Sequence, residues 1–326
     1  MVSSCTLLLC VLLGLILTSQ AKEVVLITGC SSGIGKAAAI AFAEHGDFIV
    51  YATMRSTSQW KADELPASLS ETLHIRQLDV TSPESIRAVV DEVLTVEGRI
   101  DVVINNAGYG IAGCLEVVSV EEAKRVFEVN VWGVVNVLQA VLPSMRSKSR
   151  GHVINISSTS GIRGIPCFEF YTGSKFALEG ITDSMRYSLS LYNISVTNVN
   201  AGPVRTSFTD RFGDASMGGK GTRRAEEDEL LQAYTDKMVR NLNERMSGSE
   251  VQSAEDIGRL LVELALLRRD ARSIEEVPFN LATSPSSQKV LELTRVNPRG
   301  WGGIYSSILD SVPSSASLLN FRSEEL

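Results

Sequence analysis

Short runs of apolar, β-branched residues alternate along this chain with longer segments whose apolar positions recur every three or four residues. The runs EVVLIT, FIVYAT, LHIRQLDV, DVVINNAG, HVINISS and ISVTNVN predict six strands. The longer segments predict helices that end near His45 and Val96, a long helix through Met145, and a helix from about Tyr171 to Leu191. Strands that are apolar throughout need cover on both faces, so the pattern predicts an α/β fold with a doubly wound parallel sheet.

Two of the helical patterns have apolar faces that predict contacts with the core. One face carries Leu178, Ile181, Met185 and Leu189, and the other carries Ile257, Leu260, Leu261, Leu264 and Leu267.

Three segments depart from this alternation around a single predicted catalytic domain, 22–283. Residues 1–21 hold an uncharged apolar run that ends in small residues, which favours a secretory signal and the endoplasmic reticulum or secretory pathway; a short membrane anchor is the alternative. A mis-assigned start codon would instead indicate a cytoplasmic protein. The polar, glycine-rich stretch at about 204–251 predicts a lid insertion, and 284–326 is a serine-rich tail.

Composition excludes some classes of function. The net charge of -7 argues against nucleic acid as a partner, because phosphate neutralisation needs a clustered basic surface. Cysteines and histidines are scattered, with no visible disulfide framework or metal-ligand spacing, so no metal is expected. The body of the chain carries Cys30, Cys114, Cys167, His45, His74 and His152.

The sequence TGCSSGIG follows the first strand directly and places Gly29, Gly33 and Gly35 in a strand-to-helix turn. Glycines there allow a pyrophosphate to approach the backbone N–H groups of a helix N-terminus. Such a turn also occurs for steric reasons alone. A hydrolase elbow with Ser31 as nucleophile fits the same letters, but every histidine comes too early in the chain for the usual order of a serine triad.

Several further motifs occur in a definite order after this turn. They are NNAG at 105–108, Asn130 in VNVWG, NISS ending at Ser158, YTGSK at 171–175 and NAGPVRT at 200–206. With the G-x-x-x-G-x-G spacing, they resemble the classical short-chain dehydrogenase/reductase family. The resemblance implies a Rossmann-type fold that binds a nicotinamide cofactor through Gly29, Ser31, Ser32, Gly33, Ile34, Gly35, Arg55, Asp79, Asn106, Ala107, Gly108, Tyr171, Lys175, Pro203, Val204 and Thr206.

The spacing of Tyr171 and Lys175 suits proton transfer. Four residues apart on a helix, they share a face, and the ammonium is expected to favour the phenolate. Hydride transfer at a carbinol carbon needs such a group to move the hydroxyl proton. By resemblance, Ser158 rather than Ser157 binds the substrate oxygen. Alone, Y-x-x-x-K is more often an exposed tyrosine and a solvated lysine.

Asn130 resembles the family's asparagine that holds a water in the proton relay to Lys175. The alternative is a helix asparagine whose side chain bonds to the backbone.

The end of the second strand, YATMR, bears on cofactor choice. Relatives that prefer NAD place an acid where Met54 stands, and Arg55 beside it can bind a 2'-phosphate. The sequence therefore favours NADP(H) over NAD(H), although Arg55 could simply cover the adenine.

The substrate class comes from resemblance to one branch. VVLITGCSSGIG, YATMR and SKFALEG look most like 17β-hydroxysteroid dehydrogenase type 1 and the photoreceptor-type retinol dehydrogenases, which implies a lipophilic alcohol or ketone and a homodimer. Phe168 is expected to line the substrate pocket or to pack on the sheet edge. A lyase or epimerase on this scaffold, and a catalytically silent nucleotide-binding protein, are the alternative functions.

Overall fold

The structure is a computed structural model that describes residues 21–60, 67–116, 118–208 and 251–296, with a few positions between 233 and 249. The apolar segment 1–20, most of the expected lid and the tail beyond 296 lie outside the described residues.

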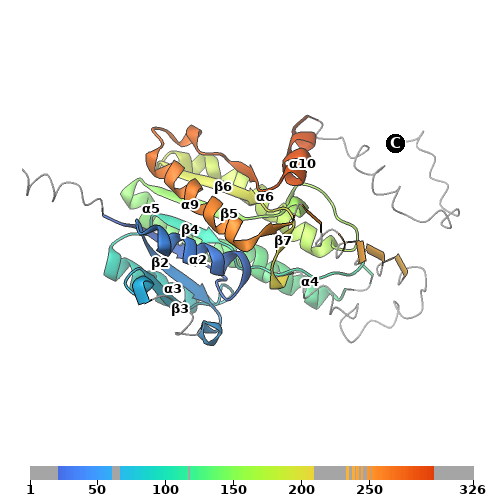
Figure 1. Ribbon diagram of the computed structural model, residues 1–326, viewed down its shortest axis with the longest axis horizontal. Coiled ribbons are helices and arrows are strands. Elements are labelled where there is room, and N and C mark those ends of the chain that lie inside the picture. The colour runs from blue at the N-terminus through green and yellow to red at the C-terminus, as the bar shows by residue number, and fades with distance from the viewer. Residues whose placement is uncertain are drawn as a thin grey trace, which may run out of the picture.

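Seven parallel strands form the central sheet, in the order β3-β2-β1-β4-β5-β6-β9 (Figure 1). Their bounds are β1 Glu23–Ile27, β2 Phe48–Met54, β3 Leu73–Gln77, β4 Val102–Asn105, β5 Gly151–Ile156, β6 Ile194–Asn200 and β9 Asn280–Ala282. A separate parallel pair joins β7 (Val204–Arg205) to β8 (Gln252–Ser253). The strand order reverses between β1 and β4, which is where doubly wound sheets bind ligands. The predicted fold class is confirmed.

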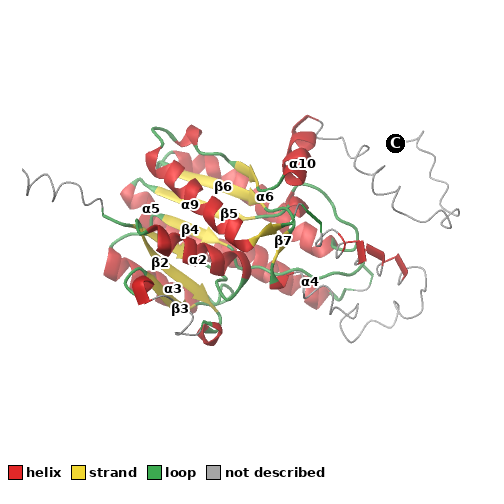
Figure 2. Ribbon diagram, in the orientation of Figure 1, coloured by secondary structure: helices red, strands yellow, loops and turns green. Residues whose placement is uncertain are grey.

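Helices cover both faces of the sheet (Figure 2). One face packs against α2 (Gly33–His45) and α9 (Ala254–Asp270), and the other against α3 (Pro83–Glu97), α5 (Gly133–Lys148) and α6 (Glu169–Ser190). Two further helices are α4 (Val120–Phe127) and α10 (Pro285–Val296). Single turns are η1 Thr57–Gln59, η3 Ala67–Leu69, η5 Thr159–Gly161, η6 Ile274–Glu276 and a π turn, η4 Glu128–Trp132.

The helical stretch Val120–Lys148, which contains α4, η4 and α5, is the one described stretch long and apolar enough to cross a membrane. Its residues Val137, Val141 and Met145 are fully buried in the core between α3, α6 and the sheet. Packing inside the domain therefore accounts for this apolar character.

Two details differ from the sequence prediction. The seventh strand, β9, was missed because three residues, Asn280–Ala282, are too short for a periodic pattern. Leu267 was assigned to the core face of α9 but is 44% exposed. At 100° per residue, Leu267 lies about 80° around the helix from the fully buried Ile257, so it falls at the margin of the apolar stripe.

Candidate active site

A cavity of about 1060 Å³ opens at the carboxyl ends of the strands. The segments that follow β1, β2, β3, β4, β5 and β6 all contribute to its wall. Because parallel strands end at the same edge of a sheet, motifs that are far apart in the sequence meet here.

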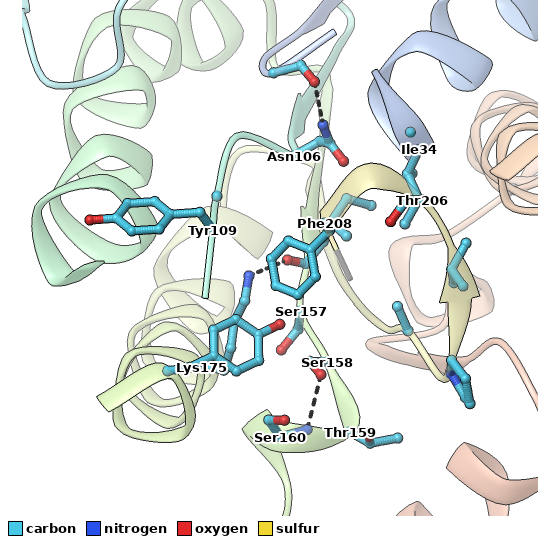
Figure 3. Close-up of a pocket in the computed structure, with 18 of the residues that line it drawn as sticks. Ile34, Asn106, Tyr109, Ser157, Ser158, Thr159, Ser160, Lys175, Thr206 and Phe208 are labelled. Atoms are coloured by element: carbon cyan, nitrogen blue, oxygen red, sulfur yellow. Dashed lines mark hydrogen bonds between the residues drawn. The ribbon is translucent and has the colours of Figure 1, made fainter. Parts of the chain in front are cut away.

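The turn after β1 has a shape that only glycine satisfies. Gly29 and Gly33 have φ angles of +74° and +57°. A Cβ atom on Gly29 would lie 2.7 Å from the Cα of Ala107, and one on Gly35 would overlap the Gly29 carbonyl oxygen. The Asn106 amide fixes the turn by donating to the carbonyl oxygens of Thr28 and Gly29, each at 3.0 Å; Figure 3 draws one of these two hydrogen bonds.

The N-terminus of α2 faces the cavity without a side-chain cap. Ser32 makes no capping hydrogen bond; its Oγ lies 2.8 Å from the Oγ of Ser207 instead. By contrast, α3, α4 and α9 are capped by Ser82, Ser119 and Ser253. The first turn of α2 carries no acidic residue; its Gly33 and Ile34 line the cavity, as do Ser31 and Ser32 just before it. Uncapped N–H groups at a helix N-terminus fit an anionic group.

The residues expected around a nucleotide line the same cavity. Arg55 is exposed at the end of β2, whereas Met54 is only 2% exposed and packs in the core. The Asp79 carboxylate accepts from the N–H and Oγ1 of Thr81, at 2.9 and 2.8 Å. Lining residues from the segments after β4 and β6 include Asn106, Ala107, Gly108, Pro203, Val204 and Thr206.

Tyr171, Lys175 and Ser158 come together at the carboxyl end of β5. Lys175 Nζ donates to the Ile156 carbonyl oxygen at 2.8 Å and lies 5.9 Å from the centroid of the Tyr171 ring. The Ser158 Oγ accepts from the Ser160 N–H at 3.1 Å, which fixes its position (Figure 3).

The pKa of Tyr171 is shifted in the direction opposite to the one predicted from the sequence. Burial raises the pKa of Tyr171 to about 12, although the Ser158 side chain acts in the other direction. Burial also lowers the pKa of Lys175 to about 8, against the attraction of Glu179. The ammonium was expected to favour the phenolate, but Nζ points at the Ile156 carbonyl and leaves desolvation dominant. At neutral pH, Tyr171 is therefore a protonated phenol that can act as an acid.

Asn130 lies in the π turn η4 and is 1% exposed. Its Oδ1 accepts from the Tyr109 N–H at 3.0 Å, and its Nδ2 donates to the Tyr109 carbonyl and to the Ser174 Oγ, at 2.9 and 3.0 Å. Both amide hydrogens are thus used within the protein. Any water bound at Asn130 must therefore donate to an oxygen, either the second lone pair of Oδ1 or the main-chain carbonyl.

Sequence reasoning missed Glu179, one helical turn beyond Lys175 on α6. Its carboxylate accepts from the side-chain amides of Asn198 and Asn200, both at 2.6 Å. Burial raises its pKa, and the hydrogen bonds from Asn200 and Asn198 oppose the shift. The spacing from Lys175 could have drawn attention to Glu179, but the approach of the β6 asparagines is a tertiary feature.

An apolar cluster, defined here as Ala112, Ile165, Phe168, Tyr171 and Phe208, forms one wall of the cavity. The ring centroids of Tyr171 and Phe208 are 5.6 Å apart, with the rings tilted by 55°. Phe208 was also missed, because it follows β7 at the start of the expected lid. Figure 3 shows Phe208 among the side chains that line the cavity.

Comparisons with known proteins give one consistent family. A family profile described as short chain dehydrogenase matches residues 23–216. The chain is 39% identical over 220 residues to a 3-ketodihydrosphingosine reductase of Bacteroides thetaiotaomicron, covering 68% of this chain and 74% of the relative. It is 40% identical over 198 residues to human retinol dehydrogenase 8, covering 60% and 63%. Human 17-beta-hydroxysteroid dehydrogenase type 1 is 39% identical over 198 residues, covering 59% and 60%. The chain thus matches less than two thirds of the length of either human relative.

Solved structures give the same fold. A short-chain dehydrogenase from Streptomyces avermitilis has a TM-score of 0.69 and 26% identity, covering 90% of this chain and all of that one. An alcohol dehydrogenase from Thermococcus sibiricus, complexed with 5-hydroxy-NADP, has a TM-score of 0.62 and 25% identity, covering 82% and 98%.

Proposed function

Because the chain belongs to the short-chain dehydrogenase family, we propose that it is an NADP(H)-dependent oxidoreductase that interconverts a hydroxyl and a carbonyl on a lipophilic substrate. One observation carries the proposal. The buried Tyr171 and Lys175 and the partly buried Ser158 share one cavity with the glycine turn and the uncapped N-terminus of α2. An acid/base group and a cradle for an anion are what hydride transfer with a dinucleotide requires.

The residues present fit a nicotinamide dinucleotide. The turn around Gly29 and Gly35 leaves no room for side chains, so a pyrophosphate can approach the first N–H groups of α2. Asp79 and Asn106 would lie on the adenosine side, and the segment from Pro203 to Thr206 on the nicotinamide side. When bound, the cofactor supplies or accepts the hydride.

The protein's own residues would manage the proton. In reduction, the protonated Tyr171 hydroxyl donates to the carbonyl oxygen of the substrate, and the Ser158 Oγ donates a hydrogen bond to the same oxygen. The Lys175 ammonium then stabilises the phenolate that remains. In oxidation, the phenolate takes the proton back from the hydroxyl.

The preference for NADP(H) rests on Arg55. Its guanidinium is exposed where β2 ends and borders the cavity, which supports the proposal that it binds a 2'-phosphate. The neighbouring Met54 adds no negative charge that would repel a phosphate.

A lipophilic substrate is supported by the apolar cluster beside Tyr171. Phe168 is 4% exposed and lines the cavity together with Ile165 and Phe208. The relatives named above carry the names of a sphingoid ketone, a retinoid alcohol and a hydroxysteroid, which are all lipophilic molecules. We therefore propose a lipophilic alcohol or ketone without choosing among these three.

Tyr171→Phe tests the proposal. With NADPH and a panel of long-chain, retinoid and steroid ketones, kcat should fall about 100-fold to 10,000-fold, because the general acid is lost. NADPH affinity, measured by fluorescence titration, should change little. Tyr187→Phe is the matched control, since Tyr187 is 64% exposed on the same helix. Retention of a tenth of the wild-type kcat by Tyr171→Phe would contradict the assignment.

We further propose that the chain enters the secretory pathway through residues 1–21. Two N-x-S sequons make this testable: Asn193 is exposed in the turn after α6, whereas Asn155 is fully buried in β5. Intact-mass analysis of material from secreting cells should show an N-terminus near Lys22 and glycan on Asn193 only. A retained Met1 with alkali-resistant membrane binding would instead indicate an anchor.

A homodimer is proposed from the resemblance. Trp132 and Phe176 are 53% and 39% exposed on η4 and α6, the helical region through which relatives pair. Light scattering should give twice the chain mass, and Trp132→Glu should shift it toward the monomer.

A further inference from the structure

Cys114 and Cys167, 53 residues apart in the chain, meet beside the apolar cluster. Their Sγ atoms are 3.0 Å apart and are not joined by a disulfide. Cys114 is 8% exposed and Cys167 fully buried. The Gly113 N–H also donates to the Cys167 carbonyl oxygen at 2.7 Å. Main-chain bonding therefore keeps the two thiols together.

The backbone at Cys167 is unusual. Its φ of +60° lies in the left-handed region, which disfavours residues other than glycine. The other two described non-glycine residues of this kind, Ser149 and Asn193, follow the ends of α5 and α6. Helix ends commonly adopt that conformation. Cys167 instead lies just before α6 begins, where the surrounding structure holds it against Cys114.

The two cysteines lie in the loops that also carry members of the apolar cluster lining the cavity. Cys114 comes two residues after Ala112, and Cys167 directly precedes Phe168, so each thiol is next to a member of the apolar cluster. The side chains of Tyr234 and Met238 pack on the two cysteines, and Met238 also lines the cavity. A covalent bond here would tie together the two loops that form this wall.

We propose that Cys114 and Cys167 form a redox-dependent disulfide that joins the loop after β4 to the segment before α6. A disulfide bond is about 2.05 Å long, so a movement of about 1 Å from the present separation closes it. The proposal concerns covalent structure and does not depend on the proposed oxidoreductase activity.

The oxidant is a small-molecule or protein disulfide. The Cys114 thiolate, from the more exposed of the two thiols, attacks one sulfur of the oxidant, forming a mixed disulfide and releasing a thiolate. The Cys167 thiolate then attacks the Cys114 sulfur and displaces the second thiolate. The two thiol protons pass to the leaving thiolates, so two cysteines are oxidised while one disulfide is reduced to two thiols.

The bond would close a loop that contains α4, α5 and β5. Constraining a loop of this length in the unfolded chain should raise Tm on the order of 10 °C. It would leave the glycine turn untouched, so NADPH affinity should be the same in both redox states.

The test uses the full-length protein equilibrated in glutathione buffers, approached from the reduced and from the oxidised side. Thiols are alkylated after unfolding, and the peptides are mapped by mass spectrometry. Oxidising buffer should yield one cross-linked peptide pair that joins Cys114 to Cys167. Cys30 is the internal control: its fully buried thiol, whose pKa burial raises to about 12, should be alkylated in every sample.

Cys114→Ser supplies the second measurement. Its Tm should be the same in oxidising and reducing buffer, whereas the wild-type Tm should rise on oxidation. Alkylation of both cysteines at every glutathione ratio, or a cross-link to Cys30, would overturn the proposal. The wild-type map is decisive even if the variant fails to fold.

Discussion

The glycine turn and the apolar cluster border the same cavity but are assembled in different ways. The glycine turn is a continuous stretch from Gly29 to Gly35, completed by Asn106. The apolar cluster collects single residues from loops after β4 and β5, from α6 and from the segment after β7. A continuous motif can be recognised from its letters, whereas a cluster drawn from four segments exists only once the chain has folded.

The two regions also differ in how tightly they constrain side chains. At Gly35 an added methyl group meets main-chain atoms that cannot move aside. In the apolar cluster, Tyr171 and Phe208 meet as tilted rings that can be repacked. We therefore expect changes in the glycine turn to affect the cofactor strongly, and changes in the cluster to affect the substrate more mildly.

The largest effect is expected from Gly35→Ala. The new Cβ would overlap the Gly29 carbonyl oxygen and distort the turn. NADPH affinity should fall about 100-fold, equivalent to about 2.7 kcal/mol, measured by fluorescence titration. Gly180→Ala is the control, since no atom lies within 4 Å of its added Cβ on α6. Wild-type affinity in a folded Gly35→Ala protein would mean that the turn does not hold the cofactor.

An effect of comparable size, but confined to NADPH, is expected from Arg55→Ala. Loss of a charge-assisted contact should weaken NADPH by roughly 1.5 to 3 kcal/mol and leave NADH nearly unchanged, measured as kcat/KM for each cofactor. Met54→Asp would also be expected to favour NAD(H). Because Met54 is 2% exposed, that variant buries a carboxylate and must be checked for folding. Equal losses for both cofactors in Arg55→Ala would show that Arg55 does not bind the phosphate.

Phe208→Ala changes the apolar cluster, the second of the two regions compared. Removing the ring opens the wall beside Tyr171, so KM for a lipophilic ketone should rise about 10-fold through lost apolar contact, with NADPH affinity preserved. Leu191→Ala, at an 82% exposed position, should match the wild type. If NADPH affinity fell along with substrate affinity, the two regions would not be separable.

The smallest effect, a shift along the pH axis, is expected from Glu179→Gln. The Glu179 carboxylate favours the charged form of Lys175 and so raises the lysine pKa, which burial lowers to about 8. Its neutralisation lowers that pKa further, because the ammonium loses its counter-charge. The alkaline limb of kcat/KM for ketone reduction should therefore move to lower pH.

Asp183→Asn gives the matched control for Glu179→Gln. Asp183 lies one turn further along α6, is 57% exposed in its side chain and pairs with Arg186. Its pH profile should be that of the wild type. An unshifted kcat/KM profile in Glu179→Gln would show that the Glu179 carboxylate does not favour the charged form of Lys175.

The sequence alone determined the elements that repeat locally. Six strands, the helices between them and the glycine turn were predicted because apolar periodicity and glycine spacing are properties of neighbouring residues. Resemblance then selected Tyr171, Lys175 and Ser158, and the structure brings all three to the end of β5.

Only the tertiary structure decided the environment of these groups. The sequence predicted a tyrosine acidified by its lysine, but burial raises the Tyr171 pKa, and Lys175 Nζ donates to a carbonyl oxygen on β5. It likewise gave no sign that Cys114 would meet Cys167. Periodicity reports which face of an element is buried, whereas pKa values and contacts between loops depend on which elements pack together, and that is settled by the sheet order and its crossovers.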